Sequence, residues 1–134
     1  MELQTGTPIE FIALPQISQP QLNAYAQASG DMNPIHLDEE VAKSMGLPGV
    51  IAHGMLSAGF LGERARRAVR ESSNYSDFKL SRFQTRFKAM VLLGDNISVG
   101  GTVKEATDTK LVLDLQAKNQ KEEVVTTATA EFVK

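Results

Sequence analysis

The segment that most constrains the fold runs from Ile51 to Arg70, IAHGMLSAGFLGERARRAVR. Its first two-thirds are small and apolar on nearly all sides, and such a helix is buried rather than surface-exposed. Its last third carries four arginines, which suit the negative end of a helix dipole. The segment therefore predicts one long helix with a buried start and a solvated arginine end. Each of its glycines costs about 1 kcal/mol relative to alanine in a helix interior, so we expect close packing or a ligand there. These glycines are Gly54, Gly59 and Gly62.

The chain after this helix is rich in β-branched and alternating residues, which are typical of strands. Four strands are predicted there: 79–89, 97–103, 110–117 and 124–133. A short apolar run at 10–14 predicts an entering strand, for about five or six in all. Two short helices are predicted before the long one, from Ser18 to Gly30 and from Asp38 to Gly46. The prediction is an α+β fold in which an antiparallel sheet wraps around one long helix.

Length and charge limit the class of protein. A chain of 134 residues is sized for a single domain, here 1–134. Its 14 basic and 16 acidic residues give a formal charge of −2, which excludes a strongly basic nucleic-acid-binding surface. No apolar run approaches the ~20 residues of a membrane span, and the N-terminus does not resemble a secretory signal. We expect a cytoplasmic protein that binds neither nucleic acid nor membrane.

The residue types present also limit the chemistry. Cysteine is absent, which excludes disulfides, thiolate metal sites and a cysteine nucleophile. The two histidines, His36 and His53, are too few for a zinc site. Asp31 precedes His36 by five residues in a loop where Gly30 permits unusual dihedrals and Pro34 restricts Asn33 to extended geometry. A loop stiffened in this way can hold a carboxylate and an imidazole at a fixed separation.

The motif S-G-D-x-N-P-x-H at 29–36, with A-H-G-M at 52–55, resembles the MaoC-like, (R)-specific enoyl-thioester hydratase family. That resemblance covers essentially the whole chain and implies the hotdog fold. Met90 and Leu93 stand where the family often has proline, in a turn region that we expect to lie away from the loop. Gly62 stands where some members have a serine that lines the site.

The resemblance implies that Asp31 and His36 form the catalytic acid/base pair. It also implies that Gly54 binds substrate through its backbone N–H as an oxyanion donor. Asn33 is expected to support the site through bonds to the loop backbone, and it counts with Gly54 among the substrate-binding positions. No metal or redox cofactor is implied. Our assignment of the protons gives the water proton to His36 and the C2 proton to Asp31, although a coupled pair need not divide so simply.

The reaction implied is reversible hydration of a trans-2-enoyl thioester of coenzyme A or acyl carrier protein to the (R)-3-hydroxyacyl thioester. A histidine with a carboxylate can deprotonate water, and N–H groups at a helix start can stabilise the developing enolate. A homodimer or higher homo-oligomer joined through sheet edges is expected. Two alternatives stay open on the same fold: a thioesterase, and a non-catalytic subunit of a hetero-oligomeric dehydratase.

Each site residue also has a structural interpretation. Asp31 can simply cap the turn through local backbone bonds, and Gly54 can serve close packing. His53 is interpreted as a structural residue that bonds a backbone carbonyl.

Overall fold

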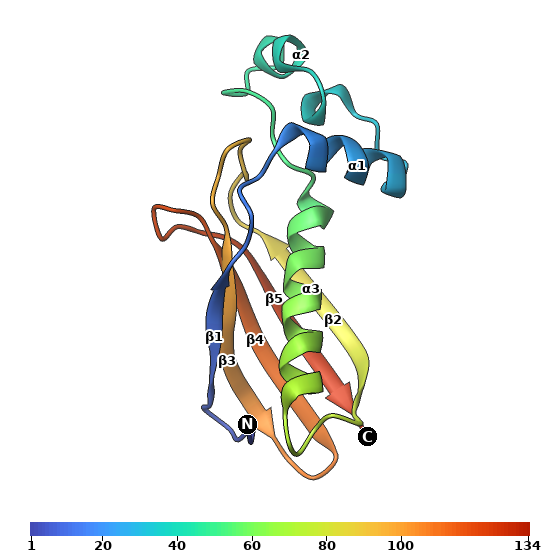
Figure 1. The fold of residues 1–134 in the computed structure, drawn as a ribbon, viewed down its shortest axis with the longest axis vertical. Helices are drawn as coiled ribbons and strands as arrows, with labels where there is room; N and C mark the ends of the chain where they lie inside the picture. The colour runs from blue at the N-terminus through green and yellow to red at the C-terminus, as the bar shows by residue number, and fades with distance from the viewer.

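A computed structural model describes residues 1–134 as a five-stranded antiparallel sheet that curves around one long helix, α3 (Gly54–Glu71) (Figure 1). The strand order is β1-β3-β4-β5-β2. The strands are β1 (Pro8–Ala13), β2 (Lys79–Phe87), β3 (Ser98–Ala106), β4 (Lys110–Lys118) and β5 (Val124–Val133). This is the predicted α+β architecture, with the lower of the two expected strand numbers.

Three short helices lie at one end of the sheet, above the N-terminal end of α3 (Figure 1). They are α1 (Gln19–Ser29), the single 3₁₀ turn η1 (Pro34–His36) and α2 (Glu39–Ser44). The predicted caps are present: the Ser18 side chain accepts from the Gln21 N–H, and the Asp38 carboxylate accepts from two N–H groups of α2. Gly30 ends α1 with φ of 80°, a left-handed conformation that glycine adopts readily. These caps fix where the η1 loop begins and ends.

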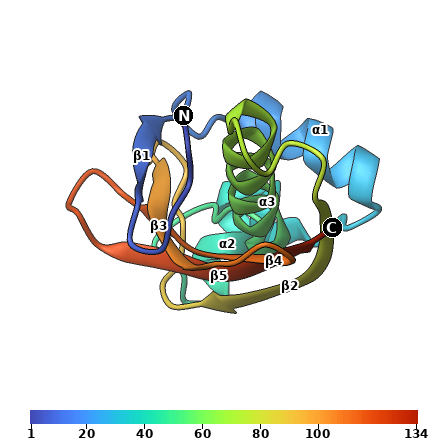
Figure 2. The same cartoon turned by 90° about the horizontal axis from the view of Figure 1, so that it is seen from below.

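The view along α3 shows this helix against the concave face of the sheet (Figure 2). The buried side chains of the core lie between them. On β4 the inward side chains Leu111, Leu113 and Leu115 are almost fully buried. They share one hydrophobic cluster with Leu61 and Ala65 of α3. None of the helices is both long and apolar enough to cross a membrane.

Two expectations for α3 are wrong. Its start is not buried on all sides, since Met55 is 61% exposed. The helix lies on the sheet along one face, so its buried residues recur at helical spacing down its whole length. Its arginine end is not wholly solvated either, because Arg64 is buried and donates from Nε and Nη2 to the Glu10 carbonyl of β1 at 3.1 and 2.8 Å. Burial, together with the charge of Arg67, lowers the pKa of Arg64.

The glycines of α3 differ in their surroundings. A Cβ atom added to Gly54 would lie 3.2 Å from Cε1 of Phe87, so this glycine is where a strand side chain approaches α3 closely. A Cβ atom on Gly59 would meet no heavy atom within 4 Å, and one on Gly62 would make only ordinary contact with Phe83. The predicted close approach is therefore confined to the first residue of the helix.

Candidate active site

His36 is held at the end of η1 with a defined orientation. Its ring is buried, and Nδ1 lies 2.8 Å from the carbonyl oxygen of Ile51. A carbonyl can only accept a hydrogen bond, so Nδ1 carries the proton and donates it. In the neutral ring this leaves Nε2 with its lone pair free to accept a proton. The bond to Ile51 therefore gives His36 the tautomer that a general base needs.

Asp31 faces His36 across a short gap. Its carboxylate Oδ2 lies 3.9 Å from His36 Nε2 and its side chain is 53% exposed. That separation is too long for a hydrogen bond, yet one small molecule can lie about 2.8 Å from both atoms. The other carboxylate oxygen, Oδ1, accepts from the Asn33 N–H at 3.2 Å. Asp31 therefore has the geometry of both interpretations. One carboxylate oxygen caps the turn, and the other faces His36.

Asn33 and Pro34 shape the loop between these two residues. Asn33 has the extended backbone expected before proline, with φ of −59° and ψ of 125°. Its side-chain oxygen accepts from the Ile35 N–H at 3.2 Å. This is the expected side-chain-to-backbone bond, and it starts η1 so that His36 turns inward.

His53 stacks on His36, with ring centroids 3.9 Å apart and an interplanar angle of 25°. Its Nε2 lies 3.1 Å from the Asp31 carbonyl oxygen, so the predicted bond to a backbone carbonyl is present. Ligand atoms of Asp31, His36 and His53 lie within 4.8 Å of one another. Each imidazole lone pair lies in its ring plane, however, and nearly parallel rings do not direct two lone pairs at one tetrahedral ion. The geometry of this cluster does not suit a metal centre.

A cavity of about 340 Å³ adjoins His36. Gly54 lines it at the start of α3, and Phe87 and the residues after β2 form the opposite wall. The Gly54 N–H has no acceptor within the chain, and it lies at the positive end of the helix dipole. An imidazole and a free N–H thus line one largely apolar cavity, an arrangement able to move a proton and to stabilise a developing oxyanion.

Most residues that line this cavity were not predicted as site residues, and Met90, Ser57 and Thr126 are the instructive cases. Met90 lines it, so the turn region after β2 does not lie away from the site, contrary to expectation. Ser57 and Thr126 line it as well and are otherwise buried. Ser57 follows Gly54 by one helical turn, and a polar residue on the apolar part of the helix was a usable signal. Thr126 reaches the cavity through the pairing of β2 with β5, where it lies opposite Phe87. Met90 reaches it because the segment after β2 bonds to residues 50–52. No local sequence pattern specifies either contact.

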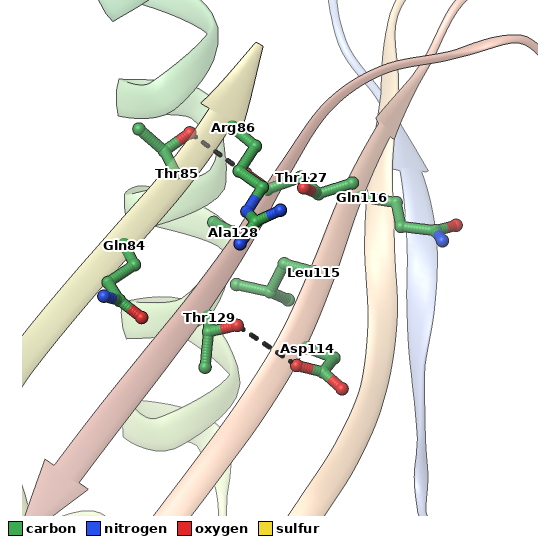
Figure 3. A pocket seen from close by; sticks show the side chains of 9 residues that line it. All are labelled: Gln84, Thr85, Arg86, Asp114, Leu115, Gln116, Thr127, Ala128 and Thr129. Carbon is green, nitrogen blue, oxygen red and sulfur yellow. Dashed lines mark hydrogen bonds between the residues drawn. The ribbon is translucent and has the colours of Figure 1, made fainter. Parts of the chain in front are cut away.

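A larger hollow of about 510 Å³ lies over β2, β5 and β4 (Figure 3). Figure 3 shows it on the face of the sheet away from α3, with Asp114 and Thr129 joined by a 3.3 Å hydrogen bond. None of the residues that line it belongs to the Asp31–His36 loop or to the start of α3. The smaller cavity, which adjoins the histidine, is therefore the candidate active site.

The family model described as "MaoC like domain" matches residues 2–127. The chain belongs to this family of MaoC-like hydratases and dehydratases. The R-hydratase PhaJ1 from Pseudomonas aeruginosa superposes with a TM-score of 0.80 at 27% identity, covering 98% of this chain and 81% of the other. A MaoC-like dehydratase structure gives 0.82 at 29% identity, covering 98% of this chain and 40% of that one. These similarities confirm the hotdog fold.

Among curated proteins, the (R)-specific enoyl-CoA hydratase of Rhodospirillum rubrum is 35% identical over 88 residues, which cover 65% of this chain and 58% of that hydratase. Fatty acid synthase 2 of Mycosarcoma maydis is 30% identical over 124 residues. This MaoC-like chain spans only 3% of the synthase, with 90% of its own length aligned.

Proposed function

We propose that this chain catalyses reversible hydration of a trans-2-enoyl thioester to the (R)-3-hydroxyacyl thioester. The observation that carries the proposal is that Asp31 Oδ2 and His36 Nε2 face each other at 3.9 Å beside a cavity that Gly54 also lines. The (R)-specific hydratase among its relatives supports the stereochemistry. Coenzyme A or an acyl carrier protein would carry the acyl group.

The residues would share the proton transfers. His36 Nε2 takes a proton from water as the water oxygen bonds to C3, and the Ile51 carbonyl holds the ring through Nδ1. The electrons of the C2–C3 double bond move toward the thioester carbonyl, whose oxygen accepts the Gly54 N–H. Asp31, which enters this step as the carboxylic acid, delivers its proton to C2 and becomes a carboxylate. The proton that His36 took from water then passes to Asp31, which restores both residues for the next turnover. Dehydration runs the same steps in reverse.

We also propose a homodimer joined through β2. This strand pairs only with β5, and its free edge carries Leu80 and Phe87, which are 47% and 54% exposed. The unpaired backbone groups of an edge strand, with exposed apolar side chains beside them, favour pairing with another strand. Phe87 also lines the cavity, so a partner seated on this edge would border the site.

The test follows the enoyl-thioester absorbance of crotonyl-CoA with the purified chain, with free thiol measured in parallel. Loss of the band without thiol release supports the proposal. Thiol release identifies a thioesterase, and no change with short, long or carrier-linked enoyl substrates identifies a non-catalytic subunit. Gel filtration checks the dimer.

Two variants test the assigned residues. Asp31→Asn removes the proton donor, and His36→Asn keeps a donor near Nδ1 for the Ile51 carbonyl while removing Nε2. We expect each to lower kcat by about 10²–10⁴-fold. Asp77→Asn, an exposed carboxylate in the loop before β2, is the matched control and should retain activity. Wild-type turnover in either site variant would remove that residue from the mechanism.

A further inference from the structure

His53 is a buried polar residue that contacts both Asp31 and His36, and the proposed mechanism assigns it no role. It is 1% exposed and occupies the N-cap position of α3, directly before Gly54. Its ring lies between Tyr25, which meets it edge-on at 4.8 Å, and His36, which stacks on it at 3.9 Å. It does not line the cavity, so it has no direct access to a bound substrate.

The hydrogen bond from His53 connects the Asp31 loop to a part of the chain that is distant in sequence. The Asp31 N–H donates to Ser29 and the Asn33 N–H donates to Asp31, so these bonds stay within the loop. For residues 30–33, the bond from His53 Nε2 to the Asp31 carbonyl is the one that reaches a distant part of the chain. Asp31 itself is exposed. The local bonds set the shape of this turn, and the bond from His53 is the one that fixes the turn, and with it the carboxylate, relative to α3.

The cost of keeping a histidine here points to the same role. The Asp31 carbonyl only accepts, so His53 carries its proton on Nε2. Its Nδ1 is then buried without a hydrogen-bond partner. An unsatisfied buried polar atom costs about 1–3 kcal/mol. A residue needed only to fill the space would be more stable as an apolar side chain, so the Nε2–H donor must be what this position requires.

We propose that His53 is a positioning residue that keeps Asp31 and His36, the proposed catalytic pair, in a fixed relative position. Its Nε2–H fixes the backbone of Asp31, and its face fixes the plane of the His36 ring. This inference rests on the proposed function, because it assigns His53 a task for the Asp31–His36 pair. A histidine with only a structural role would affect stability. This proposal predicts in addition that turnover depends on the Nε2–H group of His53.

Two nearly isosteric variants separate the N–H from the bulk of the side chain. In His53→Gln the amide nitrogen reaches the position of Nε2 and keeps the donor to Asp31. In His53→Asn the amide nitrogen reaches only the position of Nδ1 and loses it. We expect His53→Asn to lower kcat by about 10²-fold, the effect of a misplacement near 1 Å, with KM changed by less than about 3-fold. His53→Gln should restore most of kcat.

A second measurement does not need turnover. The chain has two histidines, so ¹⁵N-edited imidazole spectra assign both rings directly. We expect His36 as the Nδ1–H tautomer and His53 as the Nε2–H tautomer. Backbone ¹⁵N relaxation at residues 31–33 should show added mobility in His53→Asn but not in His53→Gln.

The two readouts separate failure of this inference from failure of the proposed function. Suppose that no enoyl thioester is hydrated but the tautomers and the loop mobility are as expected. The role of His53 in fixing the loop is then supported, and the proposed reaction is refuted. The inference is overturned if folded His53→Asn has wild-type kcat, if both variants lose kcat equally, or if loop mobility is the same in both. Thermal unfolding of each variant establishes the folded fraction to which kcat is referred.

Discussion

Replacing Gly54 with alanine places one methyl group between the start of α3 and the Phe87 ring. The added Cβ would lie 3.2, 3.4 and 3.5 Å from three carbons of the Phe87 ring. Carbon atoms pack best at about 3.5–4.0 Å, so the ring must move by about half an ångström. The three atoms belong to the far end of a side chain and not to the backbone, so rotation of the Phe87 side chain can supply that movement. The protein should therefore fold, with the ring displaced along the cavity wall.

The expected effect is on catalysis rather than on stability. The methyl group and the displaced ring narrow the approach to the Gly54 N–H, which we propose contacts the thioester oxygen. Loss of one oxyanion donor costs about 10²–10³-fold in other enzymes. Because the N–H remains here, we expect a 10–100-fold loss of kcat/KM, or about 1.4–2.7 kcal/mol. The free energy of unfolding should change by less than about 1 kcal/mol.

Initial rates on crotonyl-CoA measure this effect, and two further variants interpret it. Gly59→Ala is the matched control in the same helix, because its Cβ meets nothing within 4 Å. It should keep wild-type kcat/KM and gain about 1 kcal/mol of stability. Adding Phe87→Leu to Gly54→Ala should restore activity if the ring is the obstruction. Wild-type kcat/KM in Gly54→Ala would refute the role given to the space around Gly54.

Two further predictions concern stability. In Gly101→Ala the new Cβ would overlap the Asp114 carbonyl oxygen of β4, so β3 and β4 must separate. We expect urea denaturation to show a loss of about 3 kcal/mol or more, and a loss under about 1 kcal/mol would contradict this. Burial, with a smaller contribution from Asp108, raises the pKa of Tyr75 above 10.0, and its hydroxyl donates to the Thr107 carbonyl at 2.6 Å. A group whose pKa is raised on folding loses its contribution as pH rises through the folded pKa. The stability advantage of wild type over Tyr75→Phe, about 1 kcal/mol, should therefore be full at about pH 8 and shrink above about pH 10. A constant difference across that range would argue against it.

The elements of this fold that rest on local signals were predictable. Ser18, Gly30 and Asp38 mark helix ends through bonds to backbone groups only a few residues away. The sequence therefore locates the loop that carries the site. The exposure of Met55 and the burial of Arg64 were not predictable in this way, because both depend on which face of α3 the sheet covers.

In the candidate site, too, features that depend on nearby residues were predictable, and features that depend on distant contacts were not. The spacing of Asp31 and His36 within one stiff loop indicated a pair, and the structure brings them to 3.9 Å. The tautomer of His36 depends on the carbonyl of Ile51, and every residue has a carbonyl. A bond to a distant main-chain group leaves no mark on the residue type of the partner. The stacking of His53 on His36 depends likewise on where η1 meets α3.

The sequence separation between paired strands affects the order in which the parts of this protein fold. β3, β4 and β5 follow one another and pair in sequence, whereas β1 pairs with β3, joining Pro8 to Thr102. Contacts between distant residues form more slowly, since more chain entropy is lost before they form. We expect the three-strand meander to form first and the edges to join it last. The Asp31–His36 loop lies between β1 and α3, so the site would mature only at the end of folding. Until then the chain presents unpaired strand edges, and such edges favour aggregation.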